Sequence, residues 1–192
     1  MKKRRNRKET RRKILEATHK LLREGGYLTR FSLDAVAKEA GVSKGGLMHH
    51  FASKDALLQA AARDAIDKFE ARMEQEVVAK KQQAGGFTRS YVNVVLGKDG
   101  MNATELSPIL LNYMRLAGKD LAESRFQHWQ ERTDADGIDV DLATIVRLAV
   151  DGLIYTEMID SERIDEARRV RIRERLLQML EKVDKSASHL DD

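Results

Sequence analysis

Cysteine is absent from the sequence, proline occurs once, and aromatic residues make up only 5% of the chain. The absence of cysteine excludes disulfide bonds, thiolate metal sites and cysteine nucleophiles. No apolar run approaches the ~20 residues that a membrane-spanning helix needs. The N-terminus is basic and leads into an amphipathic pattern, not into the apolar core of a signal peptide. We therefore expect a folded cytoplasmic protein without a membrane partner.

Signatures of catalysis and metal binding are also missing. The sequence has no glycine-rich phosphate loop after a strand and no local Ser/His/Asp signature. The adjacent His49 and His50 would diverge by roughly 100° on a helix and could not easily chelate one metal. An acidic run lacks the closing glutamate of a calcium loop and predicts a solvated loop; its members are Asp134, Asp136, Asp139 and Asp141. We predict no enzyme, no cofactor and no metal site.

Charge is divided unevenly along the chain, although the net charge is only +4. Residues 1–54 contain 15 Lys/Arg against 5 Asp/Glu, whereas residues 55–192 contain 20 against 26. A basic front on an acidic body is typical of a chain whose front end meets a polyanion. The alternative is a solvated basic tail that only aids solubility.

Residues 33–51 carry the pattern of two short helices joined by a tight turn. Ser32 and Ser43 are the expected N-caps of the two helices. Gly41 is expected to end the first helix in the left-handed conformation. A helix, a glycine-containing turn and a second helix form the helix-turn-helix pattern, in which the second helix enters a DNA major groove. This stretch therefore predicts a DNA-reading element.

The second helix of this pattern has a core side and an outward side. At roughly 100° per residue, Leu47 and Phe51 share the core side, and Gly45 and His49 point the opposite way. Gly45 and Gly46 each cost a helix about 1 kcal/mol relative to alanine, for which close approach to DNA would compensate. The alternative is a frayed helix or a plain loop. The predicted DNA-binding residues are Thr29, Arg30, Ser32, Ser43, Lys44, Gly45, Gly46, Met48, His49, His50 and Lys54.

Helical periodicity continues through the rest of the chain. A basic arm over residues 1–9 is expected to be disordered without DNA, and its Lys2, Lys3, Arg4, Arg5 and Arg7 could lie along phosphates or in a minor groove. A polar tail is expected over 185–192. The single proline, Pro108, suits the first turn of a buried helix. The predicted helices cover about 10–25, 54–80, 87–96, 105–116, 119–132, 142–159 and 165–182.

The run ILEAT, GGY and SLDAVAKEAGVSKGGLMHHFASKDALL resembles the N-terminal domain of the TetR family of bacterial repressors. The resemblance covers about residues 10–60. Members usually carry tyrosine at the position of Met48, often as a phosphate contact, so His49 and His50 are the candidates to replace it. The resemblance implies an all-α fold, with a three-helix helix-turn-helix domain over 10–54 and a helical effector-binding and dimerisation domain over 55–184.

Two segments of the second domain are candidates for a dimer interface. The helix over 142–159 is apolar on two sides and so needs two partners. We expect it to form a four-helix bundle with the last helix and their twofold mates. The alternative is that both helices close the core of their own chain. The predicted interface residues are Leu142, Ile145, Val146, Ala149, Gly152, Leu153, Ile172, Leu176, Met179 and Leu180.

Aromatic and other large apolar residues of the second domain are the candidates for an effector pocket, because small-molecule sites are mostly apolar with a few polar groups. The predicted set is Phe87, Tyr91, Leu110, Tyr113, Met114, Phe126, Trp129 and Tyr155. Since no basic or acidic set clusters there, we expect an apolar or weakly polar effector.

Together these features predict a homodimeric, one-component transcriptional repressor. Two recognition helices about 34–36 Å apart, or a multiple of it, would read a palindromic operator. A small-molecule effector would modulate the affinity. The rival hypothesis is a DNA-binding dimer without an effector, whose second domain serves assembly or recruits a protein partner.

Overall fold

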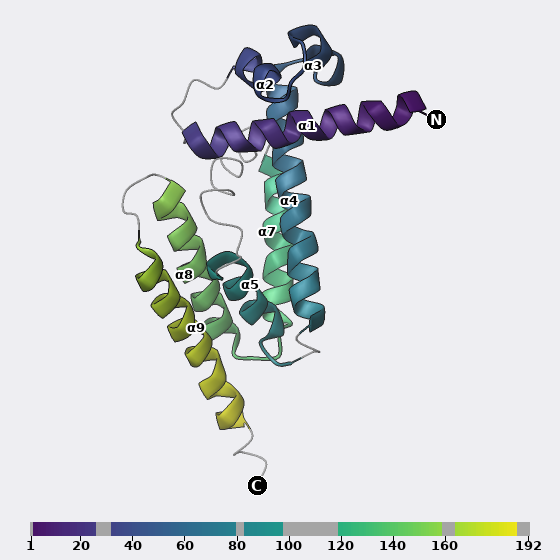
Figure 1. Cartoon of the computed structure of the whole chain (residues 1–192). Helices are drawn as coiled ribbons and strands as arrows, with labels where there is room; N and C mark the ends of the chain where they lie inside the picture. The colour runs from purple at the N-terminus through teal and green to yellow at the C-terminus, as the bar shows by residue number, and fades with distance from the viewer. Residues whose placement is uncertain (1, 26–31, 80–82, 98–118, 159–163, 188–192) are drawn as a thin grey trace. The chain divides into compact units, whose positions relative to one another are not determined.

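The computed structural model describes five stretches of the chain: residues 2–25, 32–79, 83–97, 119–158 and 164–187. These residues form eight α-helices and no β-strand (Figure 1), which confirms the predicted all-α class. No helix in these stretches combines the length and the apolar character needed to span a bilayer. The predicted helix over 105–116 lies outside the described residues, as do the candidates Thr29, Arg30, Leu110, Tyr113 and Met114.

The chain divides into two compact units. Of the described residues, those up to Asp67 belong to the first unit and those from Lys68 onward belong to the second. Helix α4 (Lys54–Ala79) contributes its first half to one unit and its second half to the other. The first unit thus extends beyond the predicted domain boundary at residue 54.

The first unit is a small helical bundle with a main apolar core and a smaller buried cluster of Leu22, Leu58, Ala62, Ala65 and Ile66. It contains α1 (Lys2–Gly25), α2 (Leu33–Glu39), α3 (Lys44–His50) and the start of α4. Figure 1 shows α2 and α3 in dark blue beside α1. The buried core residues are Ile14, Leu15, Ala17, Val36, Ala37, Leu47, Phe51, Leu57 and Ala61.

Helix α1 begins at Lys2, so the prediction of a disordered arm before Thr10 is wrong. The first nine residues carry charge but no apolar stripe, and periodicity therefore gave no sign of a helix there. Lysine and arginine nevertheless have high helix propensity. The segment continues without a break into the part of α1 that buries one side of the helix, from Ile14 to Leu22.

Hydrogen bonds between side chain and backbone build the turn from α2 to α3. Ser32 Oγ accepts from Ala35 N at 3.1 Å, and Ser43 Oγ accepts from Gly46 N at 3.0 Å. Gly41 has a φ of +66°, the left-handed conformation that ends many helices. The predicted helix-turn-helix and both of its caps are confirmed.

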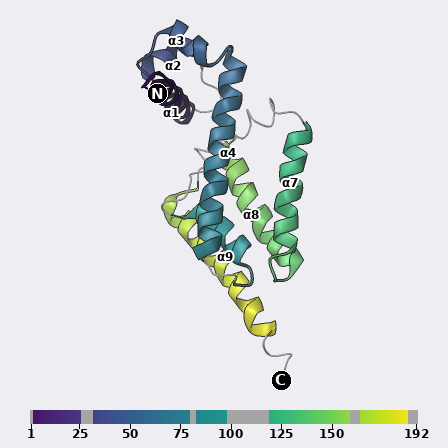
Figure 2. The ribbon, with the colours of Figure 1, turned by 90° about the vertical axis from the view of Figure 1, so that its right-hand side faces the viewer.

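Helix α5 (Gly86–Leu96) is the central element of the second unit. It contacts α7 (Lys119–Asp134), α8 (Val140–Met158) and α9 (Glu166–Ala187), and of its residues only Asn93 is not buried. Its buried polar groups are paired, because Arg89 Nη2 donates to Leu180 O at 2.9 Å and Ser90 Oγ donates to Gly86 O at 2.7 Å. Figure 2 shows α9, in yellow, beside α8.

The acidic run between α7 and α8 is exposed at Asp134, Asp139 and Asp141, in keeping with the predicted solvated loop, but two of its carboxylates also accept hydrogen bonds from helix starts. Asp136 accepts hydrogen bonds from Phe87 N at 2.7 Å and from Thr88 N at 2.8 Å. Asp139 accepts from Leu142 N at 2.8 Å. The two carboxylates therefore cap α5 and α8, where helix dipoles favour negative charge. Local sequence could not reveal the first cap because its partners lie 49 and 48 residues away.

The other predicted helix boundaries agree with the structure to within a few residues. Helix α9 extends to Ala187, so the first three residues of the predicted polar tail belong to this helix. These residues, Lys-Ser-Ala, have no apolar period that would mark them as part of the amphipathic pattern, yet each is compatible with a helix.

Candidate nucleic-acid interface and inner polar network

The outward side of α3 is a polar, largely exposed surface held by two buried anchors. Leu47 is fully buried and Phe51 is 3% exposed, so they fix the helix on the core of the first unit. The candidate residues lie around these anchors. Ser43, Lys44, Gly45, Met48 and His49 are exposed, while Gly46 and His50 are half-buried.

The two glycines of α3 differ in their surroundings. A Cβ on Gly46 would lie 3.2 Å from Ser43 Oγ, so this glycine makes room for the N-cap. A Cβ on Gly45 would meet nothing within 4 Å. Gly45 thus leaves a flat patch of exposed backbone on the outward side of the helix.

Lys44 is exposed but paired at the start of α3. Its Nζ lies 3.0 Å from Asp34 Oδ2, and both side chains are more than half exposed. Such surface ion pairs contribute only about 0–1 kcal/mol, so a phosphate could readily replace Asp34. Ser32, whose hydroxyl caps α2, and Lys54, at the start of α4, are also exposed.

The end of α3 lies beside α1, which the sequence did not reveal. The guanidinium carbon of Arg11 lies 5.0 Å from the ring centroid of Phe51. Burial lowers the pKa of His50, and the positive charges of Arg7, His49 and Arg11 lower it further. A positive cluster therefore joins α1 to the last turn of α3. Its only sequence signal is the helical spacing of Arg7 and Arg11 with the buried stripe of α1.

Four aromatic rings gather inside the second unit. Trp129 of α7 lies at a centroid distance of 5.3 Å from each of Phe69, Phe87 and Tyr91. Three of these residues belong to the predicted effector set, and Phe69 of α4 was missed. Tyr155 lies elsewhere, with 57% of its surface exposed on α8. Phe126 falls within α7, but its side chain is outside the described part of the chain.

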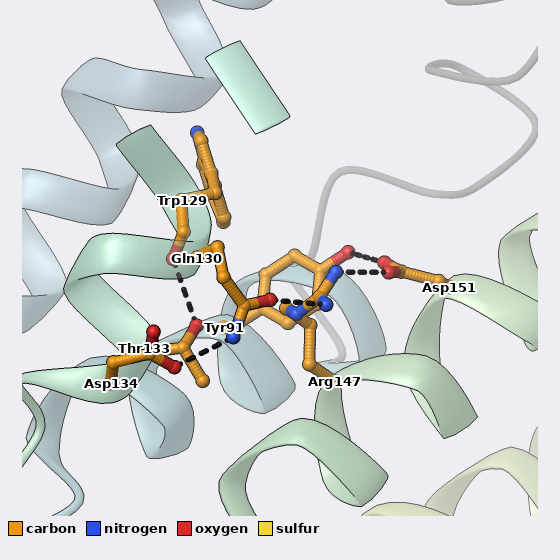
Figure 3. A network of polar contacts seen from close by, with 7 residues as sticks. All are labelled: Tyr91, Trp129, Gln130, Thr133, Asp134, Arg147 and Asp151. Carbon is orange, nitrogen blue, oxygen red and sulfur yellow. Dashed lines mark hydrogen bonds and ion pairs between the residues drawn. The ribbon is translucent and has the colours of Figure 1, made fainter. Parts of the chain in front are cut away.

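A chain of polar contacts begins at Tyr91 and crosses from α5 to α8 and α7 (Figure 3). The Tyr91 hydroxyl donates to Asp151. Arg147 Nη1 donates to Asp151 Oδ2 at 3.1 Å, and Arg147 Nη2 donates to Gln130 Oε1 at 2.8 Å. Gln130 Nε2 then donates to Asp134 Oδ1 at 2.6 Å. Arg147 thus links the acidic group of α8 to the amide of α7.

This network holds partly buried charged groups, because the side chains of Arg147 and Asp151 are 15% and 35% exposed. Burial raises the pKa of Asp151, against the hydrogen bond from Tyr91 and the charge of Arg147, which both lower it. Burial and the neighbouring Asp151 raise the pKa of Tyr91 well above its ordinary value, so it is the neutral donor. Arg147 Nε is buried without a hydrogen-bond partner among the described residues. Among the described residues the network therefore has one unsatisfied donor, the Nε of Arg147.

The residues predicted for a dimer interface fall into three groups by burial. Val146, Leu176 and Leu180 are buried in the core of their own unit, as the alternative hypothesis expected. Leu142, Leu153, Ile172 and Met179 are partly buried against that core. Ile145, Ala149 and Gly152 are exposed on α8.

The exposed members lie on an apolar face of α8. Ile145 is 56% exposed and Leu148 is 54% exposed. With the exposed Ala149, Gly152 and Tyr155 they follow helical spacing along one side of α8. Exposed side chains on the described part of α9, up to residue 181, are charged, amide or alanine. The unpaired apolar surface of the two helices is therefore on α8.

Comparisons with known proteins cover both units. Residues 14–61 match the family model described as "Bacterial regulatory proteins, tetR family", and residues 85–181 match that described as "Tetracyclin repressor-like, C-terminal domain". The HTH-type transcriptional regulator UidR of Escherichia coli K12 is 27% identical over 172 residues, which cover 83% of this chain and 85% of UidR.

Two solved structures illustrate the likeness in fold. A TetR transcription regulator from Haloarcula marismortui aligns with a TM-score of 0.66 at 18% identity, over 92% of this chain and 98% of its own. The multidrug binding protein EbrR complexed with imidazole aligns with a TM-score of 0.55 at 23% identity, over 89% of each chain.

Proposed function

The chain belongs to the TetR family of bacterial regulatory proteins and is a DNA-binding transcriptional regulator, and from this premise we propose that it is a repressor that binds a palindromic operator as a homodimer. We further propose that a small-molecule effector modulates its affinity for that operator, and that regulation, not catalysis, is its activity.

The outward side of α3 is the surface that we propose contacts DNA. No side chain or backbone in the described part of the chain requires glycine at position 45, whereas close contact of the helix backbone with a DNA groove would require it. Lys44 and His49 are exposed on either side of this patch and can reach phosphates or base edges. The proposed contacts are those predicted from the sequence: Thr29, Arg30, Ser32, Ser43, Lys44, Gly45, Gly46, Met48, His49, His50 and Lys54.

The apolar face of α8 supports the homodimer. Ile145 and Leu148 each expose more than half of their surface, and Gly152, with nothing within 4 Å of its Cβ position, would allow a second helix to approach closely. A twofold axis would pair this face with itself, burying both copies. If the two α3 helices of such a dimer enter successive turns of the major groove, the site that they bind is palindromic.

The aromatic rings and the polar network of the second unit support an effector site. Phe87, Tyr91 and Trp129 would supply apolar contacts, while the unpaired Nε of Arg147 would offer one hydrogen-bond donor. EbrR, similar in fold, has been solved with ethidium as well as with imidazole. We propose an apolar or weakly polar effector with one acceptor group.

Helix α4 is the proposed physical link between the two activities, since it contributes residues to both units. Ala61 and Leu57 belong to the core of the first unit, while Met73 belongs to the core of the second. An effector can change DNA affinity only if it binds one arrangement of the protein more tightly than another. The size of the change is limited by the difference between these two binding free energies.

Selection from a random duplex pool, followed by sequencing at a stated near-physiological salt concentration, tests the DNA-binding proposal. We expect enrichment of a palindrome. Lys44→Ala should weaken binding and lower the slope of log K against log salt by about 0.9 if it contacts a phosphate. Lys68→Ala, on the part of α4 in the second unit, is the matched control. Salt-sensitive binding without an enriched sequence would contradict a specific operator.

Ile145→Asp tests the dimer. It should give a monomer in sedimentation and weaken operator binding, because one copy cannot hold both half-sites. Val78→Asp, which changes another exposed apolar residue (73% exposed on α4), should remain a dimer. A dimeric Ile145→Asp protein would place the interface elsewhere.

A thermal shift screen separates the effector hypothesis from its rival. A ligand that binds the folded state raises the melting temperature by mass action, and Trp129→Ala should abolish that rise. If no compound both stabilises the protein and alters operator affinity, the rival form, a dimer without an effector, is favoured.

A further inference from the structure

Two arginines continue the buried side of α1 toward its N-terminus. Ile14, Leu15 and Thr18 of this side are buried. Arg11 precedes Leu15 by four residues, and Arg7 precedes Arg11 by four, so both share that side of the helix. Both are exposed. Beyond the core, this side of α1 therefore presents positive charge to the solvent.

Arg11 lies against the end of α3. Its guanidinium carbon is 5.0 Å from the ring centroid of Phe51, which is within cation–π distance. Phe51 is 3% exposed and is the C-cap of α3, so this ring is a fixed support. His50 directly precedes it, and the charges of Arg7, His49 and Arg11 act on the pKa of His50. Groups from α1 and α3 thus form one cluster, in which Arg7 and Arg11 supply the positive charge.

This cluster is not neutralised by acidic side chains of the described residues. The adjacent Arg12 pairs with Glu16 at 2.6 Å, whereas neither Arg7 nor Arg11 has such a partner there. Like charges four residues apart destabilise a helix. The first turn of α1 also contains no acidic residue to complement the helix dipole. A bound anion would relieve the repulsion between the two arginines.

We propose that Arg7 and Arg11 of α1, together with His50 of α3, bind a DNA backbone phosphate beside the groove that α3 enters. The proposal rests on the proposed function in one respect, that α3 docks on duplex DNA. Guanidinium groups match the geometry of phosphate oxygens and bind them with charge-assisted hydrogen bonds. The exposed His49 links the cluster to the outward side of α3, so a single duplex can lie on both. The partner is therefore DNA, and α1 extends the interface beyond the helix-turn-helix.

Arg7→Gln and Arg11→Gln test the site with the enriched operator as the probe. Each should weaken binding by about three- to tenfold and lower the salt slope by about 0.9 for each phosphate that the variant no longer neutralises. The preference among operator variants should not change, because phosphate contacts do not read sequence. Arg12→Gln, at the next position of the same helix, is the matched control and should keep the wild-type salt slope.

Arg11→Gln also removes the cation–π interaction with Phe51, so it would disturb α3 as well as the phosphate site. Arg7→Gln leaves that interaction in place and is therefore the decisive variant for the phosphate contact. If Arg7→Gln and Arg12→Gln show the same affinity and salt slope, the proposal is overturned. A wild-type protein that selects no operator would instead contradict the proposed function.

The ring protons of His50 provide an independent readout by NMR. In the free protein, Arg7→Gln should raise the pKa of His50, since one of the charges that lower it is removed. Addition of operator DNA to the wild type should also raise that pKa, because a phosphate would favour the protonated ring. An unchanged pKa on DNA binding would remove His50 from the site.

Discussion

In the first unit the polar candidates lie outside a small apolar core, whereas in the second unit they lie within the packed helices. The side chains of Lys44 and His49 on α3 are exposed to solvent, and the stability of that helix depends on the buried Leu47. Tyr91 and Arg147 are themselves part of the interior, and their contacts join three helices. Binding and stability should therefore be separable in the first unit and coupled in the second.

Leu47→Ala should have the largest effect, because it should reduce the stability of the first unit and DNA binding together. Leu47 is fully buried, and deleting such a side chain leaves a cavity that costs about 2–5 kcal/mol of stability. DNA binding should be abolished as well, because α3 would no longer be anchored. Chemical denaturation of the full chain measures the change.

Met48→Ala is the control for this prediction. Met48 is the next residue and is 39% exposed, so its replacement should change stability by no more than about 0.5 kcal/mol. Equal losses of stability in the two variants would mean that α3 is not anchored as described.

Asp151→Ala tests the coupling of binding and stability in the second unit. It leaves the Tyr91 hydroxyl and Arg147 Nη1 without their acceptor, and each such buried polar group costs about 1–3 kcal/mol. The melting temperature should fall, and any effector response should change with it. Asp151→Asn keeps an acceptor oxygen and should restore part of the stability. Full stability in Asp151→Ala would contradict a structural role for the network.

Gly45→Ala separates stability from binding in the first unit most sharply, because the two should change in opposite directions. Alanine should stabilise α3 by up to about 1 kcal/mol, since a Cβ there meets nothing within 4 Å. Operator affinity should nevertheless fall, because the methyl group would hold DNA away from the backbone. Thermal denaturation and operator titration on the same sample would check both changes. Unchanged affinity would show that this patch does not face DNA.

The smallest expected effect is a dependence of operator affinity on pH. The pKa of His50 is lowered from 6.5 in the free protein by burial and by Arg7, His49 and Arg11, and a nearby phosphate would raise it. DNA binding would then take up protons. The gain in affinity is complete below the pKa of the free state and disappears as pH rises through the pKa of the complex.

Operator titrations at several pH values between about 5.5 and 8 measure this dependence. His50→Gln should reduce the dependence of operator affinity on pH to the part that His49 contributes. His128→Gln in α7 should leave that dependence unchanged. A wild-type affinity that is the same throughout this range would contradict proton uptake at His50.

Much of the fold could be predicted because its signals are local. Apolar periodicity located the helices around the second core, and Ser32, Gly41 and Ser43 marked the helix ends with residues suited to those positions. The first turns of α1 could not be predicted, because periodicity detects a buried face and none of the described side chains before Ile14, those of residues 6–13, is buried. The candidate site was predicted only in part for the same reason, since α3 could be read alone but its neighbours could not.

The sequence by itself determined the helix-turn-helix and the side of α3 that faces outward, since caps and helical spacing act within a few residues. Only the tertiary structure decided that Arg11 supports the end of α3, that Asp136 caps α5, and that Tyr91 meets Asp151 across 60 residues. It also decided that Val146 is buried while Ile145 is exposed. Pairing between distant residues depends on which helix faces pack together, and that choice is made by the free energy of the whole core.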